Sequence, residues 1–191
     1  MKNILLFASG SGTNAENIIL HFNKTNTAKV VAVFSNNPNA KVLERAESLN
    51  VERFVFSRED LSTEIVLNRV QKFKPDLIVL AGFLWKFPQN IIEAYPNKII
   101  NIHPALLPKY GGKGMYGMNV HKAILENKEL ETGITIHYID EHYDEGDIIF
   151  QKNVSVADCN SPEEIANKVH LLEKEFFPQI IEKIITHNSQ F

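Results

Sequence analysis

The sequence has little of what a secreted or disulfide-stabilised protein needs. It holds a single cysteine, Cys159, among 191 residues, so no disulfide can form within the chain and a reducing, cytoplasmic compartment is expected. The opening apolar run, residues 4–8, is shorter than the roughly 7–15 residues of a signal peptide's apolar core. No run approaches the about 18 apolar residues of a membrane span. Secreted, membrane-spanning and disulfide-scaffold classes are therefore not expected.

Positive charge is also scarce. There are 20 Lys+Arg against 23 Asp+Glu, which gives a formal net charge of −3. Nucleic-acid binding needs clustered positive charge, so we expect neither a nucleic-acid partner nor a membrane partner. Hydrophobic residues make up 44% and charged residues 23% of the chain, as in an ordinary globular protein. The length fits one domain spanning 1–191.

The first hundred residues alternate between short apolar runs and helical patterns. Nearly continuous apolar runs suit strands that are buried on both faces of a parallel sheet. These runs are 4–8, 30–34, 77–81 and 99–102, with 53–56 as a weaker edge strand. The helical patterns between them are 14–23, 40–49, 61–73 and 88–94. This alternation predicts a doubly wound α/β fold, with one mostly parallel sheet and helices on both of its faces.

The pattern changes after residue 102. Residues 103–118 contain two prolines and four glycines, which predicts a loop too long to be a mere connection. A short helix follows at about 120–126, with Asn119 as its N-cap. The remaining expected elements are two antiparallel strands and a long C-terminal helix, at 133–139, 147–156 and from Pro162 onward.

The glycine-rich turn after the first strand, Ser9–Ala15, is the first candidate site. Its glycines allow a sharp turn that exposes amides at a helix N-terminus, where an anion is favoured. Thr13 and Glu16 also match the spacing of a capping box. A dinucleotide site would need an acidic residue after the second strand, and residues 34–38 hold none. We favour a phosphate monoester over NAD, with a plain strand–helix turn as the alternative.

A second candidate site follows the fifth apolar run. Asn101 and His103 lie on one face of that strand, because side chains alternate along a strand. They also lie at the strand's carboxyl end, where open α/β sheets bind ligands. An amide donor beside an imidazole suits oxyanion stabilisation and proton transfer. The alternative is a histidine held by a backbone carbonyl at the strand end.

The acidic turn 144–147 leaves three interpretations open. It suits a solvated hairpin turn or a divalent metal site, although its spacing matches no calcium loop. In the third interpretation Asp144 pairs with His103. The carboxylate would then raise the pKa of His103 above its usual value of about 6.5.

Several segments together resemble a known family. They are SGSGTN at 9–14, VFSN at 33–36, LAGF at 80–83, NIHPALLPKY at 101–110, GITIH at 133–137 and DEG at 144–146. Over residues 1 to about 185 the chain is similar to the phosphoribosylglycinamide formyltransferases, the folate-dependent formyltransferases of purine synthesis. The NIHP and LLP motifs mark the wider formyltransferase group, and SGSGTN narrows the resemblance to this branch.

The resemblance implies transfer of a formyl group from 10-formyltetrahydrofolate, a co-substrate, to the glycyl amine of glycinamide ribonucleotide on the way to IMP, with no metal. It implies a catalytic set of Asn101, His103 and Asp144, and ribonucleotide binding by Gly12, Thr13, Asn14 and Glu173. It implies folate binding by Arg58, Leu84, Trp85, Lys86, Phe87, Asn101, Asp140 and Asp144, with backbone groups of 139–144 at the pterin. Arg58 is matched only by allowing a gap. The resemblance further implies a ribonucleotide-binding half at about 1–100 and a catalytic and folate-binding half at about 101–191.

The implied mechanism is direct transfer through a tetrahedral intermediate. Asn101 and a protonated His103 would donate to its oxyanion, and Asp144 would keep His103 charged and relay a proton. His137 would lie behind this set, or have a merely structural role. His121 and His142 are interpreted as ordinary surface or loop residues. Small molecules are the expected partners, and the protein is expected to be a monomer or a homodimer.

Rival functions remain at this stage. Within the same chemistry they are a formyltetrahydrofolate hydrolase, a sugar-nucleotide formyltransferase and a methionyl-tRNA formyltransferase, each of which is expected to carry more chain. From a different class comes an NAD(P)-binding protein, which the missing acidic residue disfavours.

Overall fold

The computed structural model describes residues 1–141 and 144–187. Its strands form a sheet in the order β3-β2-β1-β4-β5-β6-β7. The chain divides into two compact units: Met1–Ile100 with the chain from Pro178 onward, and Asn101–Phe177. Strand β5, Ile99–His103, begins in the first unit and ends in the second.

Parallel strands form the first unit's part of the sheet. They are β1 (Lys2–Phe7), β2 (Ala28–Ser35), β3 (Glu52–Val55) and β4 (Leu77–Leu80). β1 pairs in parallel with β2 and with β4, and β2 pairs in parallel with β3. Residues 4–8 and 77–80 are buried throughout, which is why these strands appear in the sequence as continuous apolar runs.

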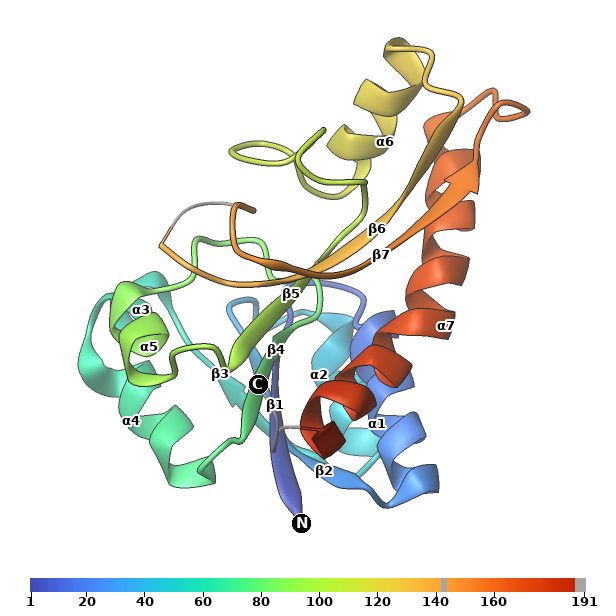
Figure 1. The fold of residues 1–191 in the computed structure, drawn as a ribbon. Helices are drawn as coiled ribbons and strands as arrows, with labels where there is room; N and C mark the ends of the chain where they lie inside the picture. Colours follow the sequence, from blue (N-terminus) through green and yellow to red (C-terminus); the bar gives the residue numbers. More distant parts are fainter. Residues whose placement is uncertain (142–143, 188–191) are drawn as a thin grey trace. The chain divides into compact units, whose positions relative to one another are not determined.

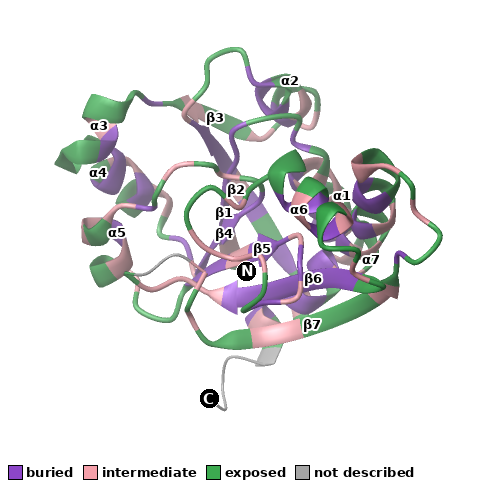
Figure 2. Ribbon diagram, turned by 90° about the horizontal axis from the view of Figure 1, so that it is seen from above, coloured by how far each residue is buried: buried purple, intermediate pink, exposed green. Residues whose placement is uncertain are grey.

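Helices cover both faces of this parallel sheet. They are α1 (Thr13–Thr25), α2 (Lys41–Ser48), α3 (Arg58–Ser62), α4 (Glu64–Phe73) and α5 (Gln89–Ala94). Helices α1 and α2 lie on one face, and α3, α4 and α5 on the other (Figures 1 and 2). The helix predicted at 61–73 is therefore two helices, because Thr63 ends α3 and caps α4.

Aromatic rings fill the core beside the carboxyl ends of these strands. Phe7, the last residue of β1, is fully buried, with ring centroids 5.1 Å from Phe34 and 5.0 Å from Phe87. Phe56 and Phe83 pack against the same ring at 5.9 Å and 5.6 Å. Tilted and edge-on pairs at these distances are favourable and fix ring positions. The loops that leave β1 and β4 therefore start from a rigid base.

The second unit consists of a loop, two antiparallel strands and two helical segments. Its elements are α6 (Met118–Glu126), β6 (Glu131–Tyr138), β7 (Ile148–Ser155) and the first part of α7 (Pro162–His187). β6 pairs antiparallel with β7. The prediction of Asn119 as N-cap of α6 is wrong: the helix begins at Met118 after Gly117, whose φ of 53° is easily adopted by glycine.

The predicted fold class is confirmed. The sheet is mostly parallel, with helices on both faces, antiparallel C-terminal strands and a long C-terminal helix. Among the described residues, no helix is both long and apolar enough to span a bilayer.

Candidate active site

The glycine loop of the first unit joins β1 to the N-terminus of α1. Helix α1 begins at Thr13, and its N-cap is Gly12 with a φ of 73° and no side-chain cap. The predicted Thr13–Glu16 capping box is therefore wrong. A Cβ on Gly12 would lie 2.4 Å from Val42 Cγ2 and 2.6 Å from Val42 Cα. Both the left-handed conformation and the close approach of α2 require glycine here.

The first amides of α1 are the groups that an anion would meet. Within the described chain, the amides of Ser11, Gly12 and Thr13 donate to no protein acceptor. Unpaired N–H groups and the positive end of the helix dipole favour a phosphate or carboxylate at this position. Asn14, the fourth predicted ribonucleotide residue of this segment, is partly buried in the first turn of the helix.

Ser9 connects the glycine loop to the predicted folate segment after β4. Its amide donates to Gly82 O at 3.0 Å, and its hydroxyl accepts from the Leu84 amide at 3.0 Å. Ser9 is itself 7% exposed. These two bonds fix the start of segment 84–87 relative to the loop.

The predicted folate residues of the first unit fall into two groups. Leu84 and Lys86 are exposed and Trp85 is partly buried, whereas Phe87 is buried against Phe7. The guanidinium carbon of Arg58 lies 4.6 Å from the centre of the Trp85 ring, a cation–π distance. The structure thus brings Arg58 and Trp85 together, although the sequence matched Arg58 only across a gap.

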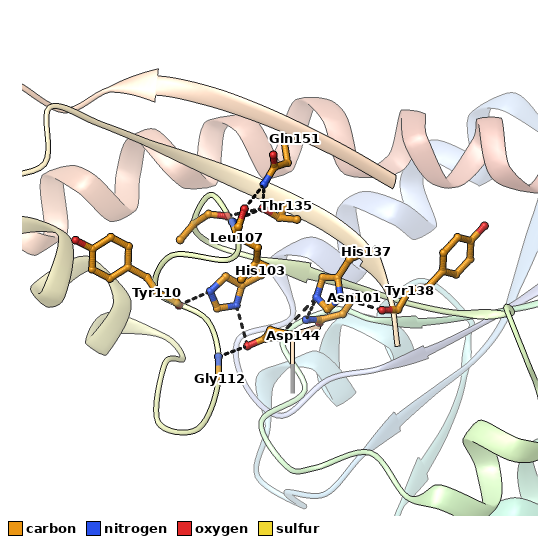
Figure 3. A network of polar contacts seen from close by, with 11 residues as sticks. Asn101, His103, Leu107, Tyr110, Gly112, Thr135, His137, Tyr138, Asp144 and Gln151 are labelled. Carbon is orange, nitrogen blue, oxygen red and sulfur yellow. Dashed lines mark hydrogen bonds and ion pairs between the residues drawn. The ribbon is translucent and has the colours of Figure 1, made fainter. Parts of the chain in front are cut away.

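The second unit brings together Asn101, His103, His137 and Asp144 (Figure 3). Asp144 Oδ2 lies 3.6 Å from His103 Nδ1, and Asp144 Oδ1 lies 3.6 Å from His137 Nε2. Asn101 Nδ2 lies 3.2 Å from His137 Nε2. The cluster is largely closed to solvent: the side chains of His103, His137 and Asp144 are 4%, 0% and 14% exposed.

The bonds of His137 show how it orients Asn101. Its Nδ1 lies 2.9 Å from Tyr138 O, and because a carbonyl only accepts, Nδ1 carries the proton. In the neutral ring Nε2 then accepts from the Asn101 amide. That bond uses one of the two Nδ2 protons, so the other remains available to a ligand. His137 therefore orients the Asn101 amide, while its part in the reaction stays a prediction.

His103 has an acceptor at each ring nitrogen. Nε2 lies 2.7 Å from Tyr110 O, and Nδ1 faces Asp144. Burial nevertheless outweighs both neighbours and lowers the pKa of His103 below its ordinary value. Burial likewise lowers the pKa of His137. The expectation that Asp144 raises the pKa of His103 above normal is therefore wrong.

The loop after β5 contacts both members of the His103–Asp144 pair. Tyr110 O accepts from His103, and the Gly112 amide donates to Asp144 Oδ2 at 2.9 Å. A Cβ on Gly111 would lie 2.6 Å from Leu107 Cδ2 and 3.3 Å from Asp144 Cβ. Residues 110–112 therefore fit closely around the pair, and a side chain at Gly111 would press on both Leu107 and Asp144.

Two polar side chains, the buried Thr135 and the exposed Gln151, hold the start of this loop. Thr135 Oγ1 accepts from the Leu107 amide at 3.0 Å and donates to Ala105 O at 2.7 Å. Gln151 Nε2 donates to Leu107 O and to Thr135 Oγ1, both at 2.9 Å (Figure 3). Sequence analysis did not identify either residue. The sequence feature that could have indicated Thr135 is that it is a polar residue within the apolar run of β6.

His121 differs from its prediction. It was interpreted as a surface or loop residue, but it lies on α6 and is 3% exposed. Its Nδ1 has no hydrogen-bond partner among the described residues. Burial, with smaller contributions from His170 and His103, lowers the pKa of His121 to about 4. The period of α6 could have indicated this, because His121 lies next to Val120 and three residues before Ile124, which are both buried.

Two further predicted residues lie in the second unit. Asp140 is partly buried, and Glu173 on α7 is 8% exposed. Of the predicted pterin segment 139–144, residues 142 and 143 lie outside the described residues, and so does the predicted loop residue His142. Over the described ranges, no group of three or more His, Cys, Asp and Glu side chains is arranged to hold a metal ion.

Comparison with known proteins gives concordant matches. The family model described as formyl transferase matches residues 2–181. A phosphoribosylglycinamide formyltransferase of Bacillus subtilis (strain 168) is 32% identical over 196 residues, which cover 100% of this chain and 98% of that protein. A chloroplastic phosphoribosylglycinamide formyltransferase of Arabidopsis thaliana is 35% identical over 94% of this chain, which spans 64% of that longer protein. The crystal structure of glycinamide ribonucleotide transformylase 1 from Geobacillus kaustophilus superposes with a TM-score of 0.88 at 34% identity, covering 97% of this chain and 99% of that one.

Proposed function

The chain belongs to the formyl transferase family, within which its relatives are phosphoribosylglycinamide formyltransferases, and we propose that it performs their reaction. In this proposal the formyl group of 10-formyltetrahydrofolate passes to the glycyl amine of phosphoribosylglycinamide. The observation that carries the proposal is the buried cluster of Asn101, His103 and Asp144, in which an amide and an imidazole lie beside one carboxylate.

The chemistry requires a negative oxygen to be stabilised. The neutral amine attacks the formyl carbon, and the carbonyl electrons move to oxygen to give a tetrahedral intermediate. The free Nδ2 proton of Asn101 donates to that oxygen, and a protonated His103 stabilises it through its positive charge. Groups that are preoriented in a largely buried site stabilise such a charge effectively, and removing one donor typically costs about 10²–10³ in rate.

The lowered pKa of His103 is compatible with stabilising the oxyanion, because the resting enzyme and the intermediate favour different protonation states of the ring. A neutral imidazole costs less to keep buried in the resting enzyme. When the oxyanion forms beside it, the new negative charge and Asp144 together favour the protonated ring. The charged form then exists mainly when the intermediate does, which stabilises the intermediate more than the bound substrates.

Asp144 is the group that moves the proton. After attack the amine nitrogen is positively charged and must lose one proton, and the departing folate nitrogen must gain one. Asp144, which is partly open to solvent, accepts the first and supplies the second, through water where the distance requires it. The C–N bond to folate breaks and the formamide forms, so no covalent enzyme intermediate is needed.

The substrate-binding residues that the resemblance implies have separate roles in this proposal. The amides at Gly12, Thr13 and Asn14 would hold the ribonucleotide phosphate, and Glu173 would contact its ribose or glycyl end. Segment 84–87 suits the folate, because exposed Leu84 and partly buried Trp85 offer apolar surface and Arg58 offers a charge for a carboxylate. Asp140 would contact the pterin.

The test is an absorbance assay of deformylation with a 10-formylfolate donor, run with and without glycinamide ribonucleotide. We expect product only when both substrates are present. Turnover without the acceptor would support the hydrolase alternative instead. Formylation of an amino sugar nucleotide but not of glycinamide ribonucleotide would show that the acceptor is misassigned.

A further inference from the structure

We propose that Arg45 of α2 is a positioning residue for phosphate binding, because it holds the Ser11 peptide so that the amides of the glycine loop face outward. The inference rests on the proposed function, in which this loop binds the phosphate of the ribonucleotide. Neither the motifs nor the family resemblance pointed to Arg45.

Three consecutive carbonyl groups of the glycine loop, those of residues 10–12, are each bound by the protein. Gly10 O accepts from the Val42 amide at 3.2 Å, and Gly12 O accepts from the Glu16 amide at 2.9 Å. Ser11 O lies between them and accepts from Arg45 Nε at 2.9 Å. Two of these three bonds come from α2, so this helix turns the carbonyl side of the loop toward itself.

The orientation of the Ser11 carbonyl matters for an anion. In a trans peptide the C=O and the following N–H point in opposite directions. Binding Ser11 O to Arg45 therefore directs the Gly12 amide to the opposite side, where it has no protein acceptor among the described residues. A peptide that rotated away would replace this donor with a carbonyl oxygen, which repels phosphate.

Arg45 is itself held in place. Its Nη1 forms an ion pair with Glu16 in the first turn of α1, while its Nε binds Ser11. The side chains of Arg45 and Glu16 are only 32% and 33% exposed. The guanidinium therefore joins α2, the loop and α1, and it neutralises a carboxylate that would otherwise lie close to the bound phosphate.

Arg53 offers a matched control. It also forms an ion pair with α2, through Glu47 at 2.6 Å, but it lies on β3, and among the described residues it forms no bond to the loop. Arg53→Gln removes an arginine–glutamate pair next to the same helix. It should leave phosphate binding unchanged if the effect of Arg45 depends on its bond to Ser11.

The experiment compares two acceptors, glycinamide ribonucleotide and the same compound without its phosphate. For Arg45→Gln we expect kcat/KM for the ribonucleotide to fall about tenfold, as for one hydrogen bond to a functional peptide. We expect less than about a twofold change for the dephosphorylated acceptor and for the KM of the folate. An equal loss on both acceptors would mean that Arg45 only stabilises the fold, and would overturn the proposal.

Variants of Glu16 distinguish an effect of the lost charge from an effect of the lost positioning. Glu16→Gln leaves the Arg45–Ser11 bond in place, and the double variant Arg45→Gln/Glu16→Gln restores the net charge but lacks the bond. The proposal expects the double variant to keep the loss of phosphate selectivity. Full recovery in the double variant would assign the effect to the unpaired carboxylate and contradict positioning through Ser11.

Failure of this inference differs from failure of the proposed function. If the wild type shows no turnover that depends on the ribonucleotide, the proposed function fails. If Gly12→Ala weakens ribonucleotide binding but Arg45→Gln does not, the loop binds phosphate without help from Arg45, and only this inference is wrong. Thermal unfolding of each variant shows whether it is folded at the assay temperature.

Discussion

The two units place their chemistry in different kinds of group. The glycine loop of the first unit offers backbone amides, which carry no titratable proton in the ordinary pH range and whose positions depend on the absence of a Cβ at Gly12. The Asn101–His103–Asp144 cluster of the second unit offers buried side chains whose charge depends on their surroundings. The glycine loop should therefore be sensitive to added side-chain volume, whereas the side-chain cluster should be sensitive to the polarity of its surroundings and to pH.

Among the changes that this comparison of the two units suggests, substitution of His103 should have the largest effect on the rate. His103→Asn keeps a polar side chain but removes the imidazole, so we expect kcat to fall about 10²–10³-fold with little change in substrate binding. Steady-state kinetics with each substrate varied in turn measures both. The control is His170→Asn, an exposed histidine of the same unit. Near-normal turnover of the His103 variant would remove it from the catalytic set.

A buried histidine of the second unit should make stability depend on pH. The pKa of His121 falls from 6.5 to about 4 on folding, so below pH 6.5 the unfolded chain binds more protons than the folded one. Stability is therefore full above about 6.5 and is lost as the pH falls toward 4. At about 1.4 kcal/mol per pKa unit, this one group contributes about 3 kcal/mol to the loss.

His121→Leu tests this directly. The variant removes the titrating group and its unpaired nitrogen, so its free energy of unfolding should fall less steeply with acidification than that of the wild type. Urea titrations at several pH values between 7 and about 4 measure the two slopes. Equal slopes for the two proteins would mean that His121 has the same pKa in the folded and the unfolded chain, which would contradict the prediction.

The shape dependence of the first unit is tested by two alanines. Gly12→Ala places a Cβ within 2.6 Å of Val42 Cα at a positive φ, whereas a Cβ on Gly10 meets no atom within 4 Å. Strain of this kind costs about 1–3 kcal/mol, so we expect the KM for the ribonucleotide to rise about 10- to 100-fold in Gly12→Ala. Gly10→Ala should change it far less. Equal rises in the KM of both substrates would show that the loop does not serve the ribonucleotide alone.

The smallest effect concerns Trp85. Exposed cation–π pairs are worth about 0.5–1 kcal/mol, so Trp85→Ala should raise the KM of the folate about two- to fivefold and leave kcat unchanged. Trp85→Phe keeps an aromatic face for Arg58 and should recover most of the loss. Because Trp85 is the only tryptophan in the chain, ligand binding beside Arg58 should also change its fluorescence. An unchanged KM in the alanine variant would mean that the stack does not serve the folate.

Local sequence pattern was enough to predict the parallel strands and to place Asn101 and His103 on one strand face. Apolar runs predicted the parallel strands because a strand buried on both faces has no polar side to reveal. Strand alternation placed Asn101 and His103 in one cluster, as Figure 3 shows. The capping-box prediction for Thr13 failed because Gly12 is the N-cap of α1 and Thr13 is already in the helix, while Glu16 pairs with Arg45, a residue distant in sequence.

The sequence by itself determined the fold class, the glycine loop and the shared strand face of Asn101 and His103, because each depends on residues that are neighbours in the chain. Only the tertiary structure decided that the pKa of His103 is lowered, that His121 is buried, and that Thr135, Gln151 and Arg45 bind loop peptides. The physical reason is that desolvation and hydrogen bonding to a peptide depend on which distant segments pack around a group. No local pattern records that packing.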